Sequence, residues 1–154
     1  MSATQLDVTH GQHFSGSHIG AFSDLDHYQF FHPQGKGRGY PGKLFLKEAL
    51  ALSSMEVSIN KLGPGQSMPF SHTHTAHEEL YIFLKGHGQF LVDGTVIDVQ
   101  EGSVIRIAPE GVRSWRNQSQ EDLHYIVIQA MAGSLSTSTI EDGVMCADKP
   151  VWPD

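Results

Sequence analysis

Apolar and polar residues alternate with a period of two along several short segments in the middle of the chain. Met55-Glu-Val-Ser-Ile-Asn60 alternates without interruption, as expected for a strand with one buried face. Leu80-Tyr-Ile-Phe-Leu84 is apolar at every position, and therefore predicts a central strand that is covered on both sides. These patterns predict β-structure rather than helix.

Three further segments complete a regular series of strands. Phe90–Val99 is expected to form a hairpin around Asp93-Gly94, because this dipeptide readily adopts the tight turns that join paired strands. Two more strands are predicted at Ser103–Ile107 and Leu123–Gln129. Short strands at this spacing, separated by turn residues, are typical of a sandwich or barrel.

The two ends of the chain lack this pattern. Residues 1–42 are rich in Gly, Ser, His and Asp and are expected to form an irregular N-terminal extension. The barrel is assigned to residues 43–131, with either a helical turn or strand plus loop near Lys47–Leu52. Residues 132–154 are polar and rich in Ser and Thr, and we expect a short C-terminal tail packed outside the core.

Composition narrows the class of protein. The 154-residue chain is 39% hydrophobic and 18% charged, which is typical of one globular domain. Its net charge of −7 argues against binding to nucleic acid or to anionic membranes. The sequence contains no 18-residue apolar run and no signal-peptide pattern at its start. The single cysteine, Cys146, excludes an internal disulfide, and we expect a cytoplasmic location.

His72, His74 and Glu79 are the clearest candidates for chemistry. Two histidines one residue apart in an extended segment point to the same side, because side chains alternate between faces. A carboxylate facing the same cavity would add an oxygen ligand. Two imidazoles and one carboxylate suit a divalent transition metal with open coordination positions.

Two stretches of the chain resemble the paired motifs of the cupin family. Gly65–Gly86 resembles the first motif, with a glycine, the His-x-His pair, a glutamate and a later glycine. Gly102–Asn117 resembles the second motif, with its Pro-x-Gly turn and terminal asparagine. The resemblance implies an all-β fold, the double-stranded β-helix or jelly-roll barrel, and often a dimer. It also implies a metal site inside the barrel, with Glu79 as the aligned carboxylate ligand.

One position departs from the family pattern. Cupins usually carry a fourth metal ligand, a histidine, after a gap of two residues from the Pro-x-Gly turn, and this chain has Ser114 there. Three interpretations follow from this difference. The metal binds to His72, His74 and Glu79 with added water, a further imidazole from His77 or His124 completes the site, or metal binding is weak or absent.

Other residues are candidates for the same site. Glu78 would replace Glu79 if the strand were shifted by one residue, because the side-chain period is two. A substrate pocket is assigned to four residues of the predicted strands and the second motif: Tyr81, Arg106, Ser114 and Gln129. Arg106 stands alone in an apolar strand, so it is expected either to hold a substrate carboxylate from inside or to lie on the outer face.

The resemblance supports two functions. One is a metal-dependent enzyme, of the dioxygenase or isomerase type, acting on a small polar molecule inside the barrel. The other is a non-catalytic cupin that binds or senses a small molecule. The family's metals are Fe, Mn, Ni, Zn and Cu. We expect a homodimer, with a small-molecule ligand and with neither nucleic acid nor membrane as a partner.

Overall fold

Two antiparallel sheets form the body of the protein. The computed structural model describes residues 5–33, 36–137 and 140–153. The larger sheet has the order β10-β7-β12-β6-β5 and the smaller sheet the order β11-β8-β9. The strands of the larger sheet are β5 (Lys43–Phe45), β6 (Met55–Leu62), β7 (His77–Lys85), β10 (Val104–Ile107) and β12 (Leu123–Met131). Those of the smaller sheet are β8 (His87–Val92), β9 (Thr95–Gln100) and β11 (Arg113–Arg116).

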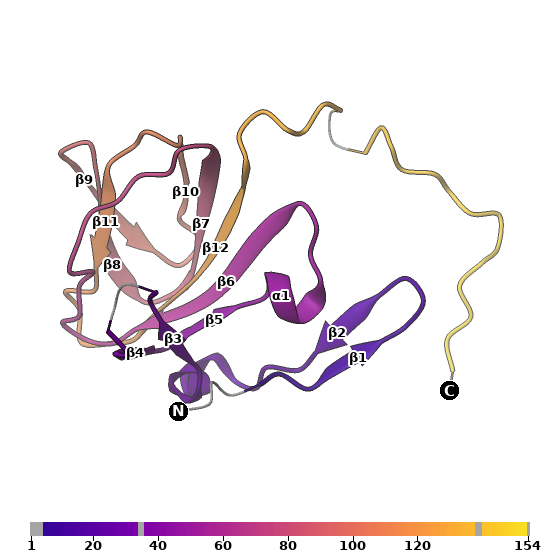
Figure 1. The fold of residues 1–154 in the computed structure, drawn as a ribbon, viewed down its shortest axis with the longest axis horizontal. Helices are drawn as coiled ribbons and strands as arrows, with labels where there is room; N and C mark the ends of the chain where they lie inside the picture. The colour runs from indigo at the N-terminus through magenta and orange to yellow at the C-terminus, as the bar shows by residue number, and fades with distance from the viewer. Residues whose placement is uncertain (1–4, 34–35, 138–139, 154) are drawn as a thin grey trace.

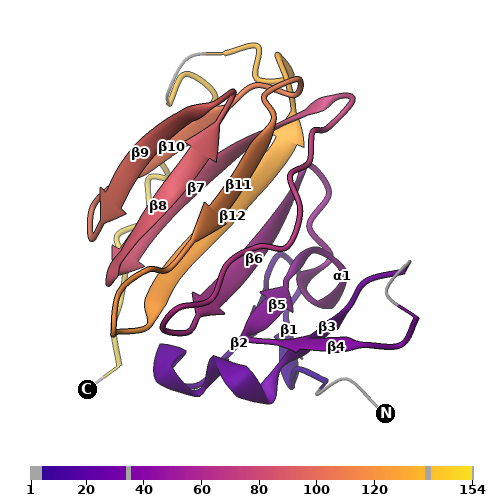
Figure 2. The ribbon, with the colours of Figure 1, turned by 90° about the vertical axis from the view of Figure 1, so that its left-hand side faces the viewer.

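The two sheets face each other (Figures 1 and 2), and aromatic residues form much of the core between them. Trp115 of β11 stacks on Phe90 of β8, with ring centroids 5.9 Å apart. Its indole N–H donates to the hydroxyl of Tyr125 on the opposite sheet at 2.8 Å. Tyr81 meets the edge of Phe90 at a centroid distance of 4.8 Å. The alternation predicted from the sequence thus buries one face of the central strands, and the all-β prediction is confirmed.

The outer face of the larger sheet is less well covered than expected. Tyr81 and Phe83 of β7 are buried against the core, but Leu80, Ile82 and Leu84 on the other face are only half-buried. The neighbouring Val104 of β10 is 64% exposed. The expectation of a strand covered on both sides is therefore wrong for the outer face, which remains an apolar surface of the single chain.

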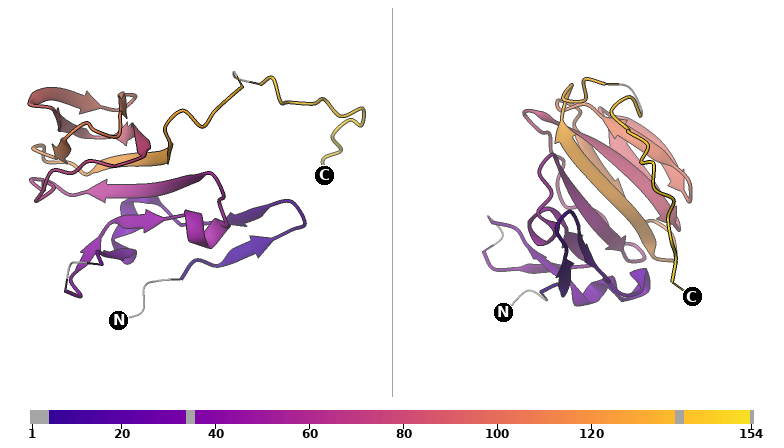
Figure 3. Two further views of the ribbon diagram at one scale, coloured as in Figure 1. Left: turned by 45° about the horizontal axis from the view of Figure 1, so that its top comes forward. Right: turned by 90° about the vertical axis from the view of Figure 1, so that its right-hand side faces the viewer.

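The N-terminal extension contains more structure than its composition suggests. It forms two hairpins, β1 (Val8–His10) with β2 (Ser15–Ser17) and β3 (Gln29–Phe31) with β4 (Gly39–Pro41). Between them lies a 3₁₀ helix, η1 (Phe22–His27), whose Leu25 is fully buried. This part of the chain lies beside β5 and β6 (Figure 3). The prediction of an irregular extension is thus wrong for these segments.

The remaining segments are simpler. A single helical turn, α1 (Lys47–Leu50), follows β5, so the helical alternative is correct there. The described part of the C-terminal tail runs away from the barrel (Figure 1). Its Met145 is 97% exposed and its Trp152 82% exposed, so these residues lie outside the core as expected but are not packed against the barrel. Over the described residues, no helix has the length and apolar character needed to cross a membrane.

Two glycines in turns of the barrel differ in the space around them. Gly86 and Gly94 both have φ near +80°, but a Cβ on Gly86 would lie 2.3 Å from the carbonyl oxygen of Asp122, whereas one on Gly94 would meet open space. We expect Gly94→Ala to lower the free energy of unfolding by about 1–2 kcal/mol, the cost of a left-handed residue. Gly86→Ala should cost clearly more. Urea denaturation measures both, and equal losses would contradict the close contact.

Candidate metal centre

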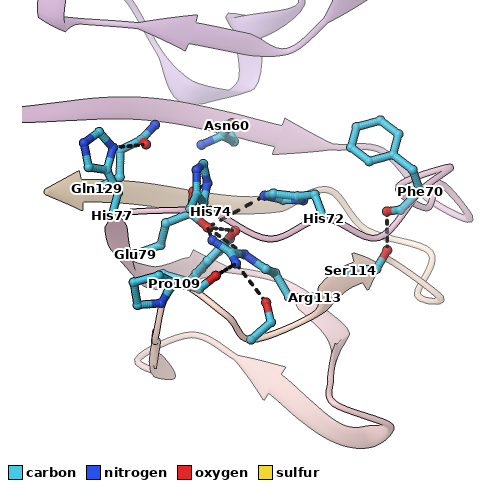
Figure 4. A network of polar contacts seen from close by, with 12 residues as sticks. Asn60, Phe70, His72, His74, His77, Glu79, Pro109, Arg113, Ser114 and Gln129 are labelled. Atoms are coloured by element: carbon cyan, nitrogen blue, oxygen red, sulfur yellow. Dashed lines mark hydrogen bonds and ion pairs between the residues drawn. The ribbon is translucent and has the colours of Figure 1, made fainter. Parts of the chain in front are cut away.

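Backbone pairing with the smaller sheet positions the two histidines. His72 and Arg113 exchange two backbone N–H···O hydrogen bonds of 3.1 Å, and the N–H of His74 donates to the carbonyl of Pro109 at 2.9 Å. This extended segment directs both imidazoles to the same side (Figure 4). Their ring centroids are 5.3 Å apart.

Glu79 enters the same space from β7. One of its oxygens, Oε1, lies 3.0 Å from Nε2 of His74. The other, Oε2, lies 3.9 Å from Nε2 of His72. One potential ligand atom from each of these three residues lies within 4.8 Å of the others, so the cluster can hold a metal ion. The structure thus brings together the residues that the sequence marked.

The carboxylate of Glu79 is held by two buried donors. The Arg113 guanidinium, with no exposed surface, donates to Oε2 through Nε at 3.0 Å and Nη2 at 2.7 Å. The hydroxyl of Tyr81 donates to the same oxygen at 2.7 Å. The third nitrogen of Arg113, Nη1, donates to the carbonyls of Pro109 and Gly111. Oε2 is therefore a structural acceptor, and Oε1 remains directed toward His74.

These surroundings decide the charge of each group. Burial raises the pKa of Glu79, but the hydrogen bonds from Tyr81 and Arg113 and the positive charge of Arg113 outweigh it, so this pKa lies below its usual value. Burial, helped by the charge of Arg113, lowers the pKa of His72 to about 4. At neutral pH the cluster therefore contains an ionised carboxylate and a neutral His72 imidazole.

The residues fit a divalent transition metal in their donor chemistry. Neutral imidazole and carboxylate are suitable ligands for Fe, Mn, Ni, Zn and Cu. Nε2 of His72 faces Glu79, 3.9 Å from Oε2, so it is the ring nitrogen placed to bind a metal, while Nδ1 is buried without a hydrogen-bond partner among the described residues. Arg113 opposes binding, because its charge offsets that of Glu79. The cluster is therefore a candidate metal site, and Arg113 reduces its negative charge.

Glu78 and Arg106 lie on the other side of the sheet. Glu78 alternates with the inward-facing Glu79, and its carboxylate accepts from the guanidinium of Arg106 at 2.7 Å. The Arg106 side chain is 59% exposed. The outer-face alternative is therefore correct for Arg106, and its proposed role in holding a substrate carboxylate is wrong.

Ser114 faces away from the metal cluster. On β11 the buried residues are Arg113 and Trp115, and Ser114 points outward, where its hydroxyl donates to the carbonyl of Phe70 at 3.1 Å. The inward position in this part of the second motif belongs to Arg113, which the sequence interpretation missed. Trp115 provided the signal, because a large apolar residue must face the core and Arg113 shares its parity.

The two further histidines do not join the three ligands. His124 lies on the outer face of β12, where its ring stacks on Phe22 of η1 at a centroid distance of 6.4 Å. Burial lowers the pKa of His124. His77 is exposed at the start of β7, and its Nδ1 lies 3.1 Å from Oε1 of Gln129. His124 is therefore excluded as a ligand by its position, and the His77–Gln129 pair lies beside the cluster.

A cavity of about 810 Å³ adjoins the cluster, and His72 contributes to its wall. The other wall residues come from the β3–β4 hairpin, the starts of β5 and β12, the end of β6 and the loop that follows it. Neither Tyr81 nor Gln129 belongs to this wall, and Ser114 lines a separate, smaller pocket of about 310 Å³. The residues assigned to a substrate pocket from the sequence therefore do not line this cavity, and part of its wall comes from the N-terminal extension.

Fold and site together define a small β-barrel protein with a His-His-Glu cluster beside an internal cavity. Comparison with known proteins identifies the family. The cupin domain model matches residues 59–129. A cupin protein from Bacteroides fragilis is 41% identical over 68% of this chain and 88% of its own, with a TM-score of 0.65. The chain belongs to the cupin superfamily, as its two motifs predicted.

More distant structures share the fold. A protein described as a predicted oxalate decarboxylase, from Thermotoga maritima, is 26% identical over 60% of this chain and 79% of its own, with a TM-score of 0.52. A sugar phosphate isomerase from Silicibacter pomeroyi is 20% identical over 60% of this chain and 67% of its own, with a TM-score of 0.53. No curated protein sequence matches this chain.

The buried ion pair between Arg113 and Glu79 should dominate local stability. We expect Arg113→Met to lower the free energy of unfolding by about 3–5 kcal/mol, because it leaves a buried carboxylate without its cation. Arg106→Met is the matched control, since it removes an exposed pair with Glu78 that is worth less than about 1 kcal/mol. Urea denaturation compares the two variants. Losses of similar size would contradict the structural role of Arg113.

Lys43 should make stability depend on alkaline pH. Burial lowers its pKa from 10.5 to about 8, against the opposing charges of Glu79 and Glu56. Between these two values the unfolded chain binds a proton that the folded chain does not, so stability should rise with pH. Over this pH range, the free energy of unfolding of the wild type should rise by at most about 3 kcal/mol relative to that of Lys43→Met. Urea denaturation at several pH values measures both proteins. A difference in unfolding free energy between them that stays constant from pH 8 to 10 would contradict this expectation.

Proposed function

We propose that this protein is a metal-dependent cupin that binds a divalent transition metal through His72, His74 and Glu79 and acts on a small molecule in the adjoining cavity. The observation that carries the proposal is the position of His72, which belongs both to the three-residue cluster and to the cavity wall. A molecule bound in the cavity would therefore lie next to the metal ligands. This proximity is what a catalytic metal site requires.

The side chains around the cluster have distinct roles in this proposal. Arg113 and Tyr81 hold Oε2 of Glu79, which orients the carboxylate and leaves Oε1 for the metal. The imidazoles of His72 and His74 supply the nitrogen ligands. A bound metal would supply Lewis-acid chemistry, as in isomerisation, or redox chemistry with dioxygen where the metal is redox-active.

The core of the barrel would limit the access of water to this chemistry. Tyr81 and Trp115 are both at most 5% exposed, and Trp115 approaches His72 with a centroid distance of 6.1 Å. Aromatic side chains thus close one side of the cluster. The cavity forms the open side, through which a small molecule would reach the ligands. A dry site strengthens the electrostatic interactions inside it.

One observation favours a second function, a cupin that binds a small molecule without catalysis. Arg113 places a positive charge against the only carboxylate of the cluster, with Nη2 at 2.7 Å from Oε2 of Glu79. A divalent cation would meet a cluster whose net charge is close to zero. In this alternative the Arg113–Glu79 pair would hold the barrel together, and the cavity alone would carry the function.

Metal analysis separates the two functions. The full chain is purified without a polyhistidine tag or added metal, and its metal content is measured by mass spectrometry. We expect close to one transition metal per chain, lost in His72→Ala and in His74→Ala, because each variant removes one of only three protein ligands. His77→Ala is the matched control, since it removes an exposed imidazole outside the cluster and should leave the metal content unchanged.

Two results would contradict the metal-dependent enzyme. A wild type that contains no metal and fails to bind added Zn²⁺, Mn²⁺ or Fe²⁺ would favour the non-catalytic binder. Alternatively, His72→Ala and His74→Ala could retain full metal content, and the ligand assignment would then be wrong. If a redox metal is found, oxygen consumption with a panel of candidate substrates tests the dioxygenase-type reaction directly.

A further inference from the structure

The charged residues in the cavity wall are all basic. Arg38, Lys43 and Lys61 line the cavity, and no Asp or Glu occurs among the described residues of the wall. The chain as a whole has the opposite balance, with 17 acidic and 10 basic residues. A basic cavity in an acidic protein creates a local positive potential, which favours an anionic ligand.

The three cations differ in how far they are already neutralised. Lys61 lies 2.5 Å from a carboxylate oxygen of Asp26 and 3.4 Å from one of Asp122. Arg38 stacks over the ring of Tyr40 at 5.5 Å, on the hairpin that forms one wall. Lys43 has no carboxylate within 4 Å of its ammonium group in the part of the chain that the structure describes. Arg38 likewise has no ion pair with a carboxylate among the described residues, so both cations are available to a ligand, and Lys43 is the one whose charged group a hydrogen bond holds in place.

The ammonium group of Lys43 is held in place by neutral groups. It donates to Oδ1 of Asn60 at 3.0 Å and lies 4.9 Å from the ring centroid of Phe45. The amide N–H groups of Asn60 donate to Ser58 and to the carbonyl of Tyr125, which orients Oδ1 toward Lys43. An ammonium has three N–H donors, and Asn60 accepts one of them. The remaining donors are ordered in advance and can be used by an anion.

Apolar groups form much of the rest of the wall. Phe30, Tyr40, Phe70 and Met68 line it, and the ring of Phe70 lies 6.1 Å from that of His72. The volume of about 810 Å³ lies within the range of cavities that hold small organic molecules. A simple inorganic ion would leave most of this apolar surface uncovered. The walls thus suit a molecule with both a charged head and an apolar body.

We propose that the cavity binds a small organic anion, whose carboxylate or phosphate head is held by Lys43 and whose apolar body lies against Phe30 and Phe70. This inference deepens the function proposed above, because it names the chemical class of the molecule that would meet the metal. The inference rests on the proposed metal-dependent function only where it concerns catalysis. The anion site itself is built from residues outside the metal cluster.

Benzoate is the first probe, with benzamide as its neutral counterpart of the same shape. Binding to the full chain is measured by titration calorimetry, first after dialysis against a chelator and then with Zn²⁺ added. We expect benzoate to bind at least about tenfold more tightly than benzamide to the metal-free protein, because hydrogen bonds to a charged group are worth this much. Phenyl phosphate, compared with benzoate, identifies the preferred head group.

Variants assign the binding to Lys43. Lys43→Met should lower benzoate affinity about tenfold and leave benzamide affinity unchanged, while Lys43→Arg should restore part of the benzoate affinity. Lys61→Met is the matched control, since the same substitution there removes a lysine already paired with Asp26 and should have little effect. Thermal unfolding of each variant verifies that it is folded.

The outcomes separate this proposal from that of the metal site. Selective benzoate binding that depends on Lys43 in chelated protein supports the anion site even if the His72→Ala metal test fails. Equal affinities for benzoate and benzamide, no benzoate binding by the wild type, or unchanged binding in Lys43→Met would each overturn the anion site. None of these three results would change the metal content expected of the wild type.

Discussion

The buried ion pair between Arg113 and Glu79 is the interaction on which the site depends. It joins β11 of the smaller sheet to β7 of the larger one across the interior. The same arginine exchanges backbone hydrogen bonds with His72 and donates to the carbonyls of Pro109 and Gly111. One residue therefore orients the carboxylate and holds the turn through its side chain, and holds the histidine segment through its backbone. A buried charge needs such complete pairing to be tolerated.

This pairing has a chemical consequence. Because Arg113 and Tyr81 hold Oε2 of Glu79, only Oε1 remains for a metal, and the charge of the carboxylate is largely balanced. The site therefore differs from a metal cluster with an unpaired acid. The nearby cavity has the complementary property, since the ammonium group of Lys43 has no carboxylate within 4 Å among the described residues. An anionic ligand would add a negative charge next to the metal cluster, where Arg113 balances the charge of Glu79.

Particular residues show which structural features could be predicted from the sequence. The alternation in Met55–Asn60 and the Asp93-Gly94 turn correspond to β6 and to the β8–β9 hairpin, because these signals depend on local backbone geometry. The inward position on β11 was misassigned to Ser114 because motif spacing was counted from the turn, although the parity of Trp115 favoured Arg113. Arg106 had two alternatives, and only its pairing with Glu78 decided between them. A period of two defines two faces, but it does not say which one is inside.

The sequence by itself determined the family, the β-strands and the three residues of the candidate metal cluster, because motif spacing and side-chain alternation are local properties. Only the tertiary structure revealed that Arg113 holds Glu79 and that the N-terminal extension closes a cavity containing Lys43. Neither feature produces a recognisable pattern in the neighbouring sequence. Each depends on contacts between segments far apart in the chain, where burial and the absence of a nearby opposite charge decide what a side chain can do.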